Sequence, residues 1–237
     1  VDNLGFIDLN KPGSAPSFFV RAEEQRDVGD RTVVAWRWVG NRTIVFTMTS
    51  REAVFGDRFN MSRLAAYDIE TGKTTPLGWT NAGAGAANIL HIDDEKERIL
   101  VQRDTVKDRQ YEGNPEVIDI DVRTGDFKNV MRSNVEVDDW IVDGKGVIRA
   151  AVGGDRDSGK QRLMYRSNDK EVLKTVSNEA DPTFTGTQIV PEIFLDEPDM
   201  AYATSNKDGH RKVYKINVKT MQVVGDVVYG IKGYDAG

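Results

Sequence analysis

The stretch LAAYDIETGKTTPL, residues 64–77, decides how the rest of the chain is interpreted. Its two ends are short runs rich in apolar residues, typical of β-strands, and Thr71-Gly72 between them is typical of a tight turn. Residues 117–130, VIDIDVRTGDFKNV, repeat this pattern with an aspartate and a Thr-Gly pair at the same offsets. The repeat predicts two β-hairpins of one kind.

Comparable hairpins are predicted in three other parts of the chain, so that five are spread along it. Counted from the second turn residue of each (13, 72, 125, 169 and 221), the spacings are 59, 53, 44 and 52 residues. A loose period of about 40–50 residues is typical of four-stranded propeller blades. The sequence therefore predicts an all-β fold, a β-propeller of four-stranded antiparallel blades over residues 1–237, with outer hairpins near 4–20, 63–79, 115–131, 162–176 and 210–227.

A second pair of strands is predicted between successive hairpins, and it completes each blade. These inner pairs are expected at 33–39 with 43–48, 89–92 with 98–102, 137–142 with 147–152, and 188–194 with 200–204. Four inner and five outer pairs make about four and a half blades. Two interpretations stay open, a piece of a ring of about six to eight blades or a small five-bladed ring that closes through its end segments. The start at Val1 inside a strand pattern favours a fragment.

The composition excludes several classes of protein. The 237 residues include no cysteine, which rules out a disulfide framework, a thiolate zinc site and a cysteine nucleophile. The net charge of −6 argues against the basic surface of a nucleic-acid binder. No run approaches about 18 consecutive apolar residues, so we expect no membrane insertion.

No motif for a cofactor, a metal or catalysis is complete. Residues 83–88, GAGAAN, begin like a dinucleotide-binding fingerprint but lack its third glycine and its helix, and are interpreted as a flexible loop. Asp119 and Asp121 lack the remaining ligands of a calcium loop. The chain has no Gly-x-Ser-x-Gly, and its two histidines, His91 and His210, lie 119 positions apart. We therefore expect no cofactor, no metal and no catalytic residue.

The connections on the two faces of such a ring differ in length and charge. Because consecutive strands are antiparallel, the turns within each strand pair lie on one face and the connections between pairs lie on the other. The latter are longer and heavily charged, at 21–27, 50–60, 104–114, 153–160 and 205–211. We expect any function to lie on that face.

Glu23 and Glu24, in the first of these connections, are the candidate substrate-binding residues. Two adjacent carboxylates can hold a cationic group such as a peptide amino terminus. The alternative interpretation is a solvated surface run, in a chain whose residues are 30% charged.

The four tryptophans fall within or at the ends of predicted strands, at Trp36, Trp38, Trp79 and Trp140. Aromatic side chains on a strand pack well against a neighbouring sheet. They are therefore interpreted as packing between blades, and not as lining a ligand site.

Residues 139–150, DWIVDGKGVIRA, followed by RLMYR at 162–166 and AYATSNKDG at 201–209, resemble the N-terminal β-propeller of bacterial prolyl oligopeptidase family serine peptidases. That family includes acylaminoacyl-peptidase and dipeptidyl-peptidase-like members. Residues 64–72 and 233–235 are similar to the same propellers, so the resemblance extends over nearly the whole chain. Its most specific stretch is 139–166, because the Thr-Gly hairpins occur in many propellers.

The resemblance implies a propeller that covers an α/β-hydrolase domain and admits only short peptides to its active site. This chain would then be the non-catalytic portion that gates peptide access and forms one wall of the substrate chamber. Its expected partners are the peptide substrate and the hydrolase domain of the same protein, which would hold the catalytic serine, aspartate and histidine. In some dipeptidyl peptidases of this family, paired glutamates from the propeller hold the substrate amino terminus. The resemblance implies that Glu23 and Glu24 correspond to them. A periplasmic or secreted location is favoured by the resemblance, and a cytoplasmic one stays open.

The alternative is a freestanding TolB-like propeller, a protein-interaction scaffold in the cell envelope. The two hypotheses differ in what the gene encodes after Gly237. A Gly-x-Ser-x-Gly sequence there would favour the peptidase, and a stop codon would favour the scaffold.

Overall fold

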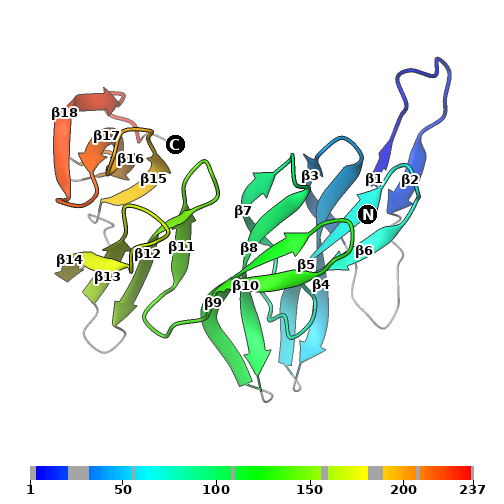
Figure 1. Cartoon of the computed structure of the whole chain (residues 1–237), viewed down its shortest axis with the longest axis horizontal. Helices are drawn as coiled ribbons and strands as arrows, with labels where there is room; N and C mark the ends of the chain where they lie inside the picture. Colours follow the sequence, from blue (N-terminus) through cyan, green and yellow to red (C-terminus); the bar gives the residue numbers. More distant parts are fainter. Residues whose placement is uncertain are drawn as a thin grey trace. The chain divides into compact units, whose positions relative to one another are not determined.

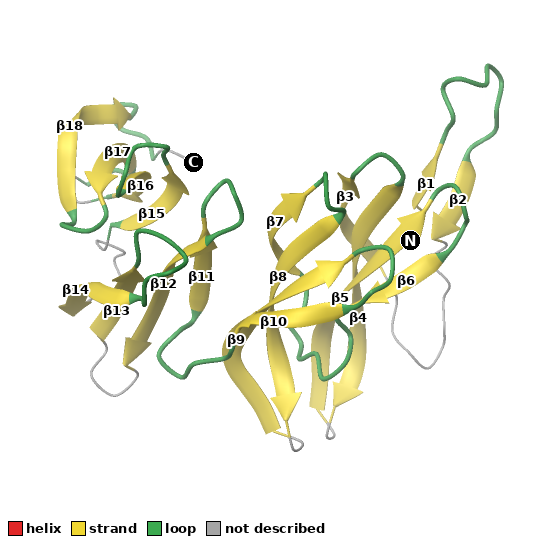
Figure 2. Ribbon diagram, viewed as in Figure 1, coloured by secondary structure: helices red, strands yellow, loops and turns green. Residues whose placement is uncertain are grey.

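The computed structural model describes residues 4–20, 32–54, 57–107, 110–155, 160–180, 189–206 and 209–235, and these residues form strands, turns and loops but no helix (Figures 1 and 2). They build four antiparallel sheets of four strands each and one sheet of two strands. The predicted all-β propeller class and its four and a half blades are therefore confirmed. Within this described part no helix could span a membrane.

The chain divides into two compact units, Val1–Arg132 and Ser133–Gly237. In the first unit the half-blade and two complete sheets follow one another along the chain, and neighbouring strands are hydrogen-bonded in chain order. The half-blade contains β1 (Leu4–Phe6) and β2 (Ser17–Val20). The first complete sheet contains β3 (Thr32–Val39), β4 (Thr43–Val54), β5 (Asp57–Asp68) and β6 (Thr74–Leu77). The second contains β7 (Asn88–Asp93), β8 (Arg98–Lys107), β9 (Gln110–Asp121) and β10 (Phe127–Met131).

The second unit has the same organisation, with two sheets of four strands among its described residues. One contains β11 (Asp139–Val142), β12 (Ile148–Asp155), β13 (Lys160–Tyr165) and β14 (Lys174–Ala180). The other contains β15 (Val190–Phe194), β16 (Met200–Ser205), β17 (Lys212–Asn217) and β18 (Gln222–Tyr229). Every sheet therefore repeats one meander in which each strand pairs with the next.

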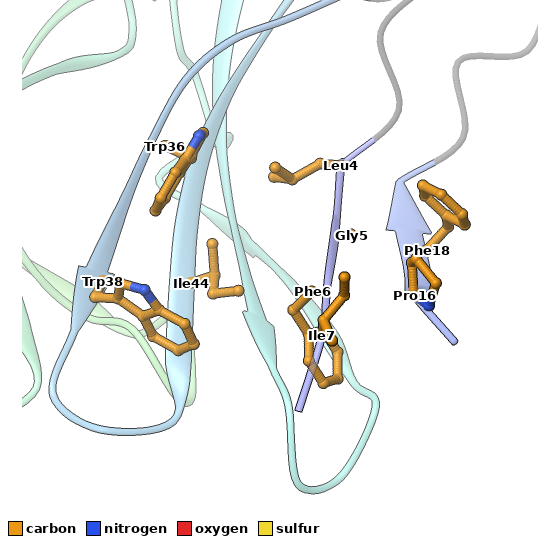
Figure 3. Close-up of a pocket in the computed structure, with 9 residues that line it drawn as sticks. All are labelled: Leu4, Gly5, Phe6, Ile7, Pro16, Phe18, Trp36, Trp38 and Ile44. Atoms are coloured by element: carbon orange, nitrogen blue, oxygen red, sulfur yellow. The ribbon is translucent and has the colours of Figure 1, made fainter. Parts of the chain in front are cut away.

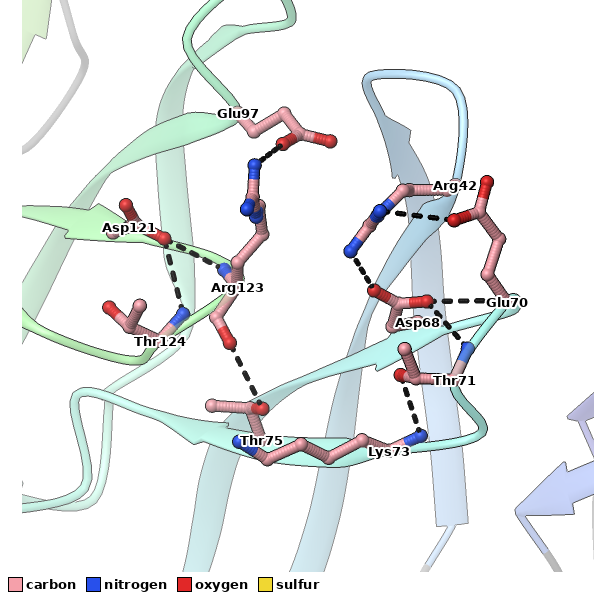
Figure 4. A network of polar contacts seen from close by, with 10 residues as sticks. All are labelled: Arg42, Asp68, Glu70, Thr71, Lys73, Thr75, Glu97, Asp121, Arg123 and Thr124. Atoms are coloured by element: carbon pink, nitrogen blue, oxygen red, sulfur yellow. Dashed lines mark hydrogen bonds and ion pairs between the residues drawn. The ribbon is translucent and has the colours of Figure 1, made fainter.

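The repeated Asp-x-x-Thr-Gly pattern forms the outer hairpin turns by a shared hydrogen-bonding scheme (Figure 4). Asp68 Oδ1 accepts hydrogen bonds from the backbone N–H groups of Glu70 and Thr71, both at 3.0 Å. Gly72 donates its N–H to the Asp68 carbonyl at 2.9 Å and has φ +70°, a conformation that costs glycine little. In the next sheet, Asp121 Oδ1 accepts from the N–H groups of Arg123 and Thr124 in the same way. The aspartate side chain thus accepts hydrogen bonds from turn N–H groups that have no backbone acceptor within the hairpin.

Each unit has an apolar core between its two four-stranded sheets. In the first unit, buried residues from both sheets form one cluster, among them Val45, Leu64, Ile99 and Ile118. In the second, Ala150, Leu163 and Tyr165 pack with residues that include Ala203, Tyr214 and Ile216. Burial of apolar area at sheet-to-sheet contacts is the main stabilising term for such folds.

A buried arginine fastens the connection between the two complete sheets of the first unit. The Arg103 side chain is 4% exposed, and its Nη2 lies 2.6 Å from Glu116 Oε1. Its Nη1 also donates to the backbone carbonyls of Gly78 and Thr80, and its guanidinium lies 4.7 Å from the centre of the Phe127 ring. The ion pair and the carbonyls together satisfy a charge that burial alone would disfavour.

A second polar network joins the two sheets of the second unit. Tyr165 donates its hydroxyl hydrogen to Asp199 Oδ1 at 2.8 Å, and Ser167 donates to the same oxygen at 2.6 Å. Arg149 Nη2 donates to the Tyr165 hydroxyl oxygen at 2.7 Å. Burial, together with the hydrogen bond to Asp199, raises the pKa of Tyr165, so its hydroxyl stays protonated as a donor.

Two of the predicted long loops are strands instead. The predicted loop at 50–60 falls on a hairpin arm, because the pairing of β4 with β5 continues from Thr43↔Asp68 to Val54↔Asp57. The predicted loop at 104–114 falls likewise on β8 and β9, which pair out to Lys107↔Gln110. The charged residues there were interpreted as a loop signal, but charged residues are also compatible with a two-stranded antiparallel arm.

The glycine-rich segment 83–88, interpreted above as a flexible loop, is held by hydrogen bonds on both sides. The Ser62 N–H donates to the Ala84 carbonyl at 2.8 Å, and the Gly83 N–H donates to the Asp104 carbonyl at 2.7 Å. Arg63 Nη1 adds a hydrogen bond to the Gly83 carbonyl at 2.7 Å. The small side chains let the segment lie closely between β5 and β8, and this tight fit explains its composition.

Asp68→Asn tests the hairpin scheme through its pH dependence. Burial alone would raise the pKa of Asp68, but the Thr71 and Glu70 N–H groups and the Arg42 guanidinium together hold it below its ordinary value of 3.8. Because the folded-state pKa is the lower one, the stabilisation is complete above the ordinary pKa and is lost as pH falls through the folded-state value. We expect Asp68→Asn to lower the free energy of unfolding by about 1 kcal/mol at pH 7. This difference should shrink on acidification below pH 3.8.

Denaturant unfolding at pH 7 and pH 3 measures both differences. Asp126→Asn, at an exposed position of the next hairpin, makes the same charge change and serves as the control. An Asp68→Asn penalty that is equal at both pH values would contradict the role assigned to the ionised carboxylate.

Candidate functional site

An apolar groove of about 570 Å³ lies in the first unit, between the half-blade and the innermost strand of the first complete sheet (Figure 3). Its volume is within the range of ligand-binding sites, about 300–1,000 Å³. No lining side chain carries an ionisable group, and the lining residues are Leu4, Gly5, Phe6, Ile7, Pro16, Phe18, Trp36, Trp38 and Ile44. The groove can therefore bind an apolar surface, but it contains no acid, base or nucleophile of its own.

The floor of the groove is one face of β3. Side chains alternate along a strand, so Trp36 and Trp38 share a face. Trp36 lies opposite Phe46 of β4, and Trp38 lies opposite Ile44. Phe46 and Ile44 are 2% and 3% exposed, but Trp36 and Trp38 are 50% and 43% exposed. One face of a single sheet is thus covered over β4 and open over β3.

The covered part of this face is held by a cluster of aromatic rings from the half-blade. The rings of Phe19 on β2 and Tyr67 on β5 are stacked, with centroids 4.0 Å apart and planes 8° from parallel. Phe19 also meets Phe46 edge to face at 5.8 Å, and Phe6 lies 6.3 Å from both Phe19 and Tyr67. These contacts attach the half-blade to β4 and β5, the two middle strands of the first complete sheet, and leave β3 half exposed.

The half-blade places one edge of β1 beside the groove (Figure 3). Among the described residues β1 pairs with β2 and with no other strand. Figure 3 shows β1 between the tryptophans of β3 on one side and β2 on the other. A free strand edge presents N–H and C=O groups that an added strand can pair. The groove therefore combines an apolar floor with a backbone hydrogen-bonding edge, which suits an extended polypeptide.

A polar depression of about 740 Å³ lies beyond Trp38, on the side of the hairpin turns. Several of its acidic groups already have partners. Arg42 Nη2 lies 2.6 Å from Asp68 Oδ2, and Arg42 Nη1 lies 3.0 Å from Glu70 Oε2 (Figure 4). Glu97 Oε2 pairs with Arg123 at 3.1 Å, and the Gly40 N–H donates to Asp94 Oδ1 at 2.9 Å. These ion pairs and hydrogen bonds hold the surrounding turns together, so we interpret the depression as structural.

The structure describes some of the residues that the sequence singled out, and others lie outside its described part. Glu23 and Glu24 lie outside the described residues, and their assignment stays a prediction. His91 lies on β7, and His210 Nδ1 lies 3.7 Å from Asp235 Oδ1 on the exposed surface of the second unit. The described part of the chain brings no three His, Asp or Glu side chains together as metal ligands.

Among the tryptophans interpreted as packing between blades, Trp140 is buried at 3% exposed, whereas Trp36 and Trp38 face the half-blade but are 50% and 43% exposed. The sequence did predict an inner strand at 33–39 that contains both tryptophans. What that strand pattern could not show is that the blade next to it has only two strands in the described chain. The sequence did predict that the first hairpin, near 4–20, has no inner strand pair. That prediction, together with the tryptophans of the next strand, was the available signal for the groove.

No protein-family model and no curated protein sequence matches the chain. Solved structures do match its fold. An acylaminoacyl peptidase in complex with Z-Gly-Gly-Phe-chloromethyl ketone is 10% identical, with a TM-score of 0.52 over 84% of this chain and 33% of that chain. The acylaminoacyl peptidase of Pyrococcus horikoshii is 11% identical, with a TM-score of 0.50 and the same coverage. TolB from Acinetobacter baumannii is 15% identical, with a TM-score of 0.44 over 95% of this chain and 48% of that chain.

These identities establish the β-propeller fold alone. The chain spans about a third of the length of the two acylaminoacyl peptidases and about half that of TolB. The expected resemblance is therefore supported at the level of propeller architecture.

Phe19→Ala tests whether the aromatic cluster holds the half-blade in place. Loss of the stacked ring removes the main contact between β2 and β5, at a cost of about 2 kcal/mol for a partly buried phenylalanine. We expect backbone amides of residues 4–20 to exchange hydrogen roughly 30-fold faster, because they open locally and not with the whole unit.

Hydrogen exchange followed by mass spectrometry measures this change. Phe18→Ala, at a half-exposed position on the same strand, is the matched control and should have a much smaller effect. Equal acceleration in the two variants, or acceleration throughout the first unit, would refute the anchoring role of Phe19.

Proposed function

We propose that this chain is the non-catalytic propeller portion of a serine peptidase that acts on short peptides. In this role it gates peptide access and forms one wall of the substrate chamber. The observation that carries the proposal is the combination of the sequence resemblance at residues 139–166 with a propeller fold like that of acylaminoacyl peptidases over 84% of the chain. The apolar lining of the groove is in keeping with a part that contacts polypeptides and performs no chemistry.

The proposal assigns the reaction to another part of the same polypeptide. An α/β-hydrolase domain would supply the nucleophile, its base and the orienting carboxylate. The sequence of this chain contains no Gly-x-Ser-x-Gly, and its two histidines are on different compact units. The expected partners are that domain and the peptide substrate, and the expected location is the periplasm or the exterior of the cell.

The alternative is a freestanding TolB-like scaffold in the cell envelope. The exposed aromatic floor of the groove favours it equally, because a surface of this kind also fits a protein partner. The two proposals differ in the polypeptide that carries the propeller, and so one experiment separates them.

Labelling with a fluorophosphonate probe tests the peptidase proposal. Extracts of cells that produce the protein are treated with the probe, and an antibody raised against residues 1–237 recovers the protein. We expect a labelled polypeptide well above 26.5 kDa, because the reactive serine lies on the same chain. The purified 237 residues alone should take up no label and should hydrolyse neither N-acylated nor free-amino peptide substrates.

A heat-denatured extract is the control for specific labelling. Recovery of an unlabelled 26.5 kDa polypeptide would refute the peptidase proposal and support the scaffold. Label on the isolated 237 residues would refute the statement that this portion is non-catalytic.

Glu23→Gln and Glu24→Gln in the full-length peptidase test the proposed amino-terminus site. Each change removes one negative charge, which weakens the attraction for a protonated amine by about 1–2 kcal/mol when the group is partly buried. We expect KM to rise about tenfold for peptides with a free amino terminus and to stay unchanged for N-acylated peptides. Glu95→Gln, on an exposed turn, is the matched control.

A KM that is unchanged for both substrate classes would remove the two glutamates from the site. A fall in kcat for both classes would show instead that the variants disturb the chamber as a whole.

A further inference from the structure

Two long hairpin arms extend from the first unit, at 50–60 on β4–β5 and at 104–114 on β8–β9 (Figure 1). Neither arm keeps the third strand that its hairpin has nearer the core. β6 pairs with β5 only at 64–67, and β7 pairs with β8 only at 98–102. Beyond these points each arm is a two-stranded hairpin, and an isolated hairpin of this kind is only marginally stable in water.

The connection between the two complete sheets, residues 78–85, lies between the bases of the two arms, and we call it the strap. On one side the Ser62 N–H of β5 donates to the Ala84 carbonyl at 2.8 Å. On the other side the Gly83 N–H donates to the Asp104 carbonyl of β8 at 2.7 Å. At these points the strap runs parallel to β5 and antiparallel to β8, as a strand inserted between them would.

Two arginines, one from the base of each arm, hold the strap by its backbone carbonyls. Arg63 Nη1 of β5 donates to the Gly83 carbonyl at 2.7 Å. Arg103 Nη1 of β8 donates to the carbonyls of Gly78 and Thr80. The strap is thus fastened to both sheets by side chains as well as by its backbone, and it cannot leave one arm without disturbing its contacts with the other.

We propose that the strap couples the two arms, so that local opening of either arm also opens the other. β4, β5, the strap, β8 and β9 are hydrogen-bonded in that order at the arm bases, which joins two marginal hairpins into one sheet. Opening one arm then costs the free energy of opening both. The arms belong to the long charged connections where we expect function, and the coupling makes them one element instead of two independent flaps. This inference depends on the fold of the first unit and not on the peptidase proposal.

Arg63→Met, followed by hydrogen exchange with mass spectrometry, tests the coupling from the first arm. The change keeps the apolar part of the side chain and removes its hydrogen bonds to the strap. We expect amides at 57–62 and also at 104–107 to exchange roughly tenfold faster, as for the loss of hydrogen bonds from a charged donor, and amides at 117–121 to be unchanged. Arg58→Met, at an exposed position of the same strand, is the matched control.

Gly85→Leu tests the same coupling from the second arm. A Cβ on Gly85 would lie 2.7 Å from Asp104 Oδ2, so a larger side chain separates the strap from β8. Because coupling between two sites is reciprocal, we expect amides at 57–62 of the first arm to exchange faster as well. Gly144→Leu, where an added Cβ has no neighbour within 4 Å, makes the same change without that clash.

Distances between spin labels measure the coupling while every contact of the strap is kept. The chain has no cysteine, so Asn60→Cys and Gln110→Cys place one label on each arm. Double electron–electron resonance should give one narrow distance distribution in this labelled protein, and a broad distribution once Arg63→Met is added.

Three results would overturn the proposal. These are a broad distance distribution before Arg63→Met is added, faster exchange only in the arm next to each substitution, or equal acceleration of exchange throughout the first unit. Circular dichroism of each variant establishes that it is folded.

Discussion

The first complete sheet of this chain carries apolar side chains on both faces, and their burial against neighbouring sheets is the main stabilising term of the first unit. Val45 and Leu64 on one face are fully buried against the next sheet. Phe46 and Tyr67 on the other face meet the rings of the half-blade. Within the first unit this burial orders the sheets along the chain, because the first complete sheet is covered by the half-blade on one side and by the β7–β10 sheet on the other. The cover is partial at Trp36 and Trp38, which stay half exposed and line the groove.

Polar side chains have a supporting role in this arrangement. Asp68 and Asp121 close the outer hairpins by accepting backbone N–H hydrogen bonds that the turns would otherwise leave to water. Arg103 and the Tyr165–Asp199 pair join neighbouring sheets, at points where buried groups are mutually satisfied. Such networks contribute less free energy than apolar burial, but they fix which surfaces meet. These charged and polar side chains could in principle bind a ligand, but their hydrogen bonds and ion pairs are made to the protein itself.

Much of the fold followed from the sequence because the hairpins carry local signals. The Asp-x-x-Thr-Gly pattern specifies two of the turns by contacts within five residues, and together with three other strand–turn–strand patterns it was enough to count the blades. The arms at the ends of β4 and β8 were missed because charged residues are compatible both with a loop and with an exposed hairpin. The groove depends on which neighbour covers Trp36, a long-range property that a strand pattern does not contain. Glu23 and Glu24 came from the family resemblance and from charge, and they stand as a prediction.

The account depends most on the claim that the inner part of one blade face is open in this chain. Hydroxyl-radical footprinting with mass spectrometry measures this directly, by comparing oxidation rates of individual tryptophans in the folded protein. Trp36 and Trp38, at 50% and 43% exposed, should oxidise many times faster than Trp140, at 3%. Protection of Trp36 and Trp38 equal to that of Trp140 would contradict the account, because the face would then be covered.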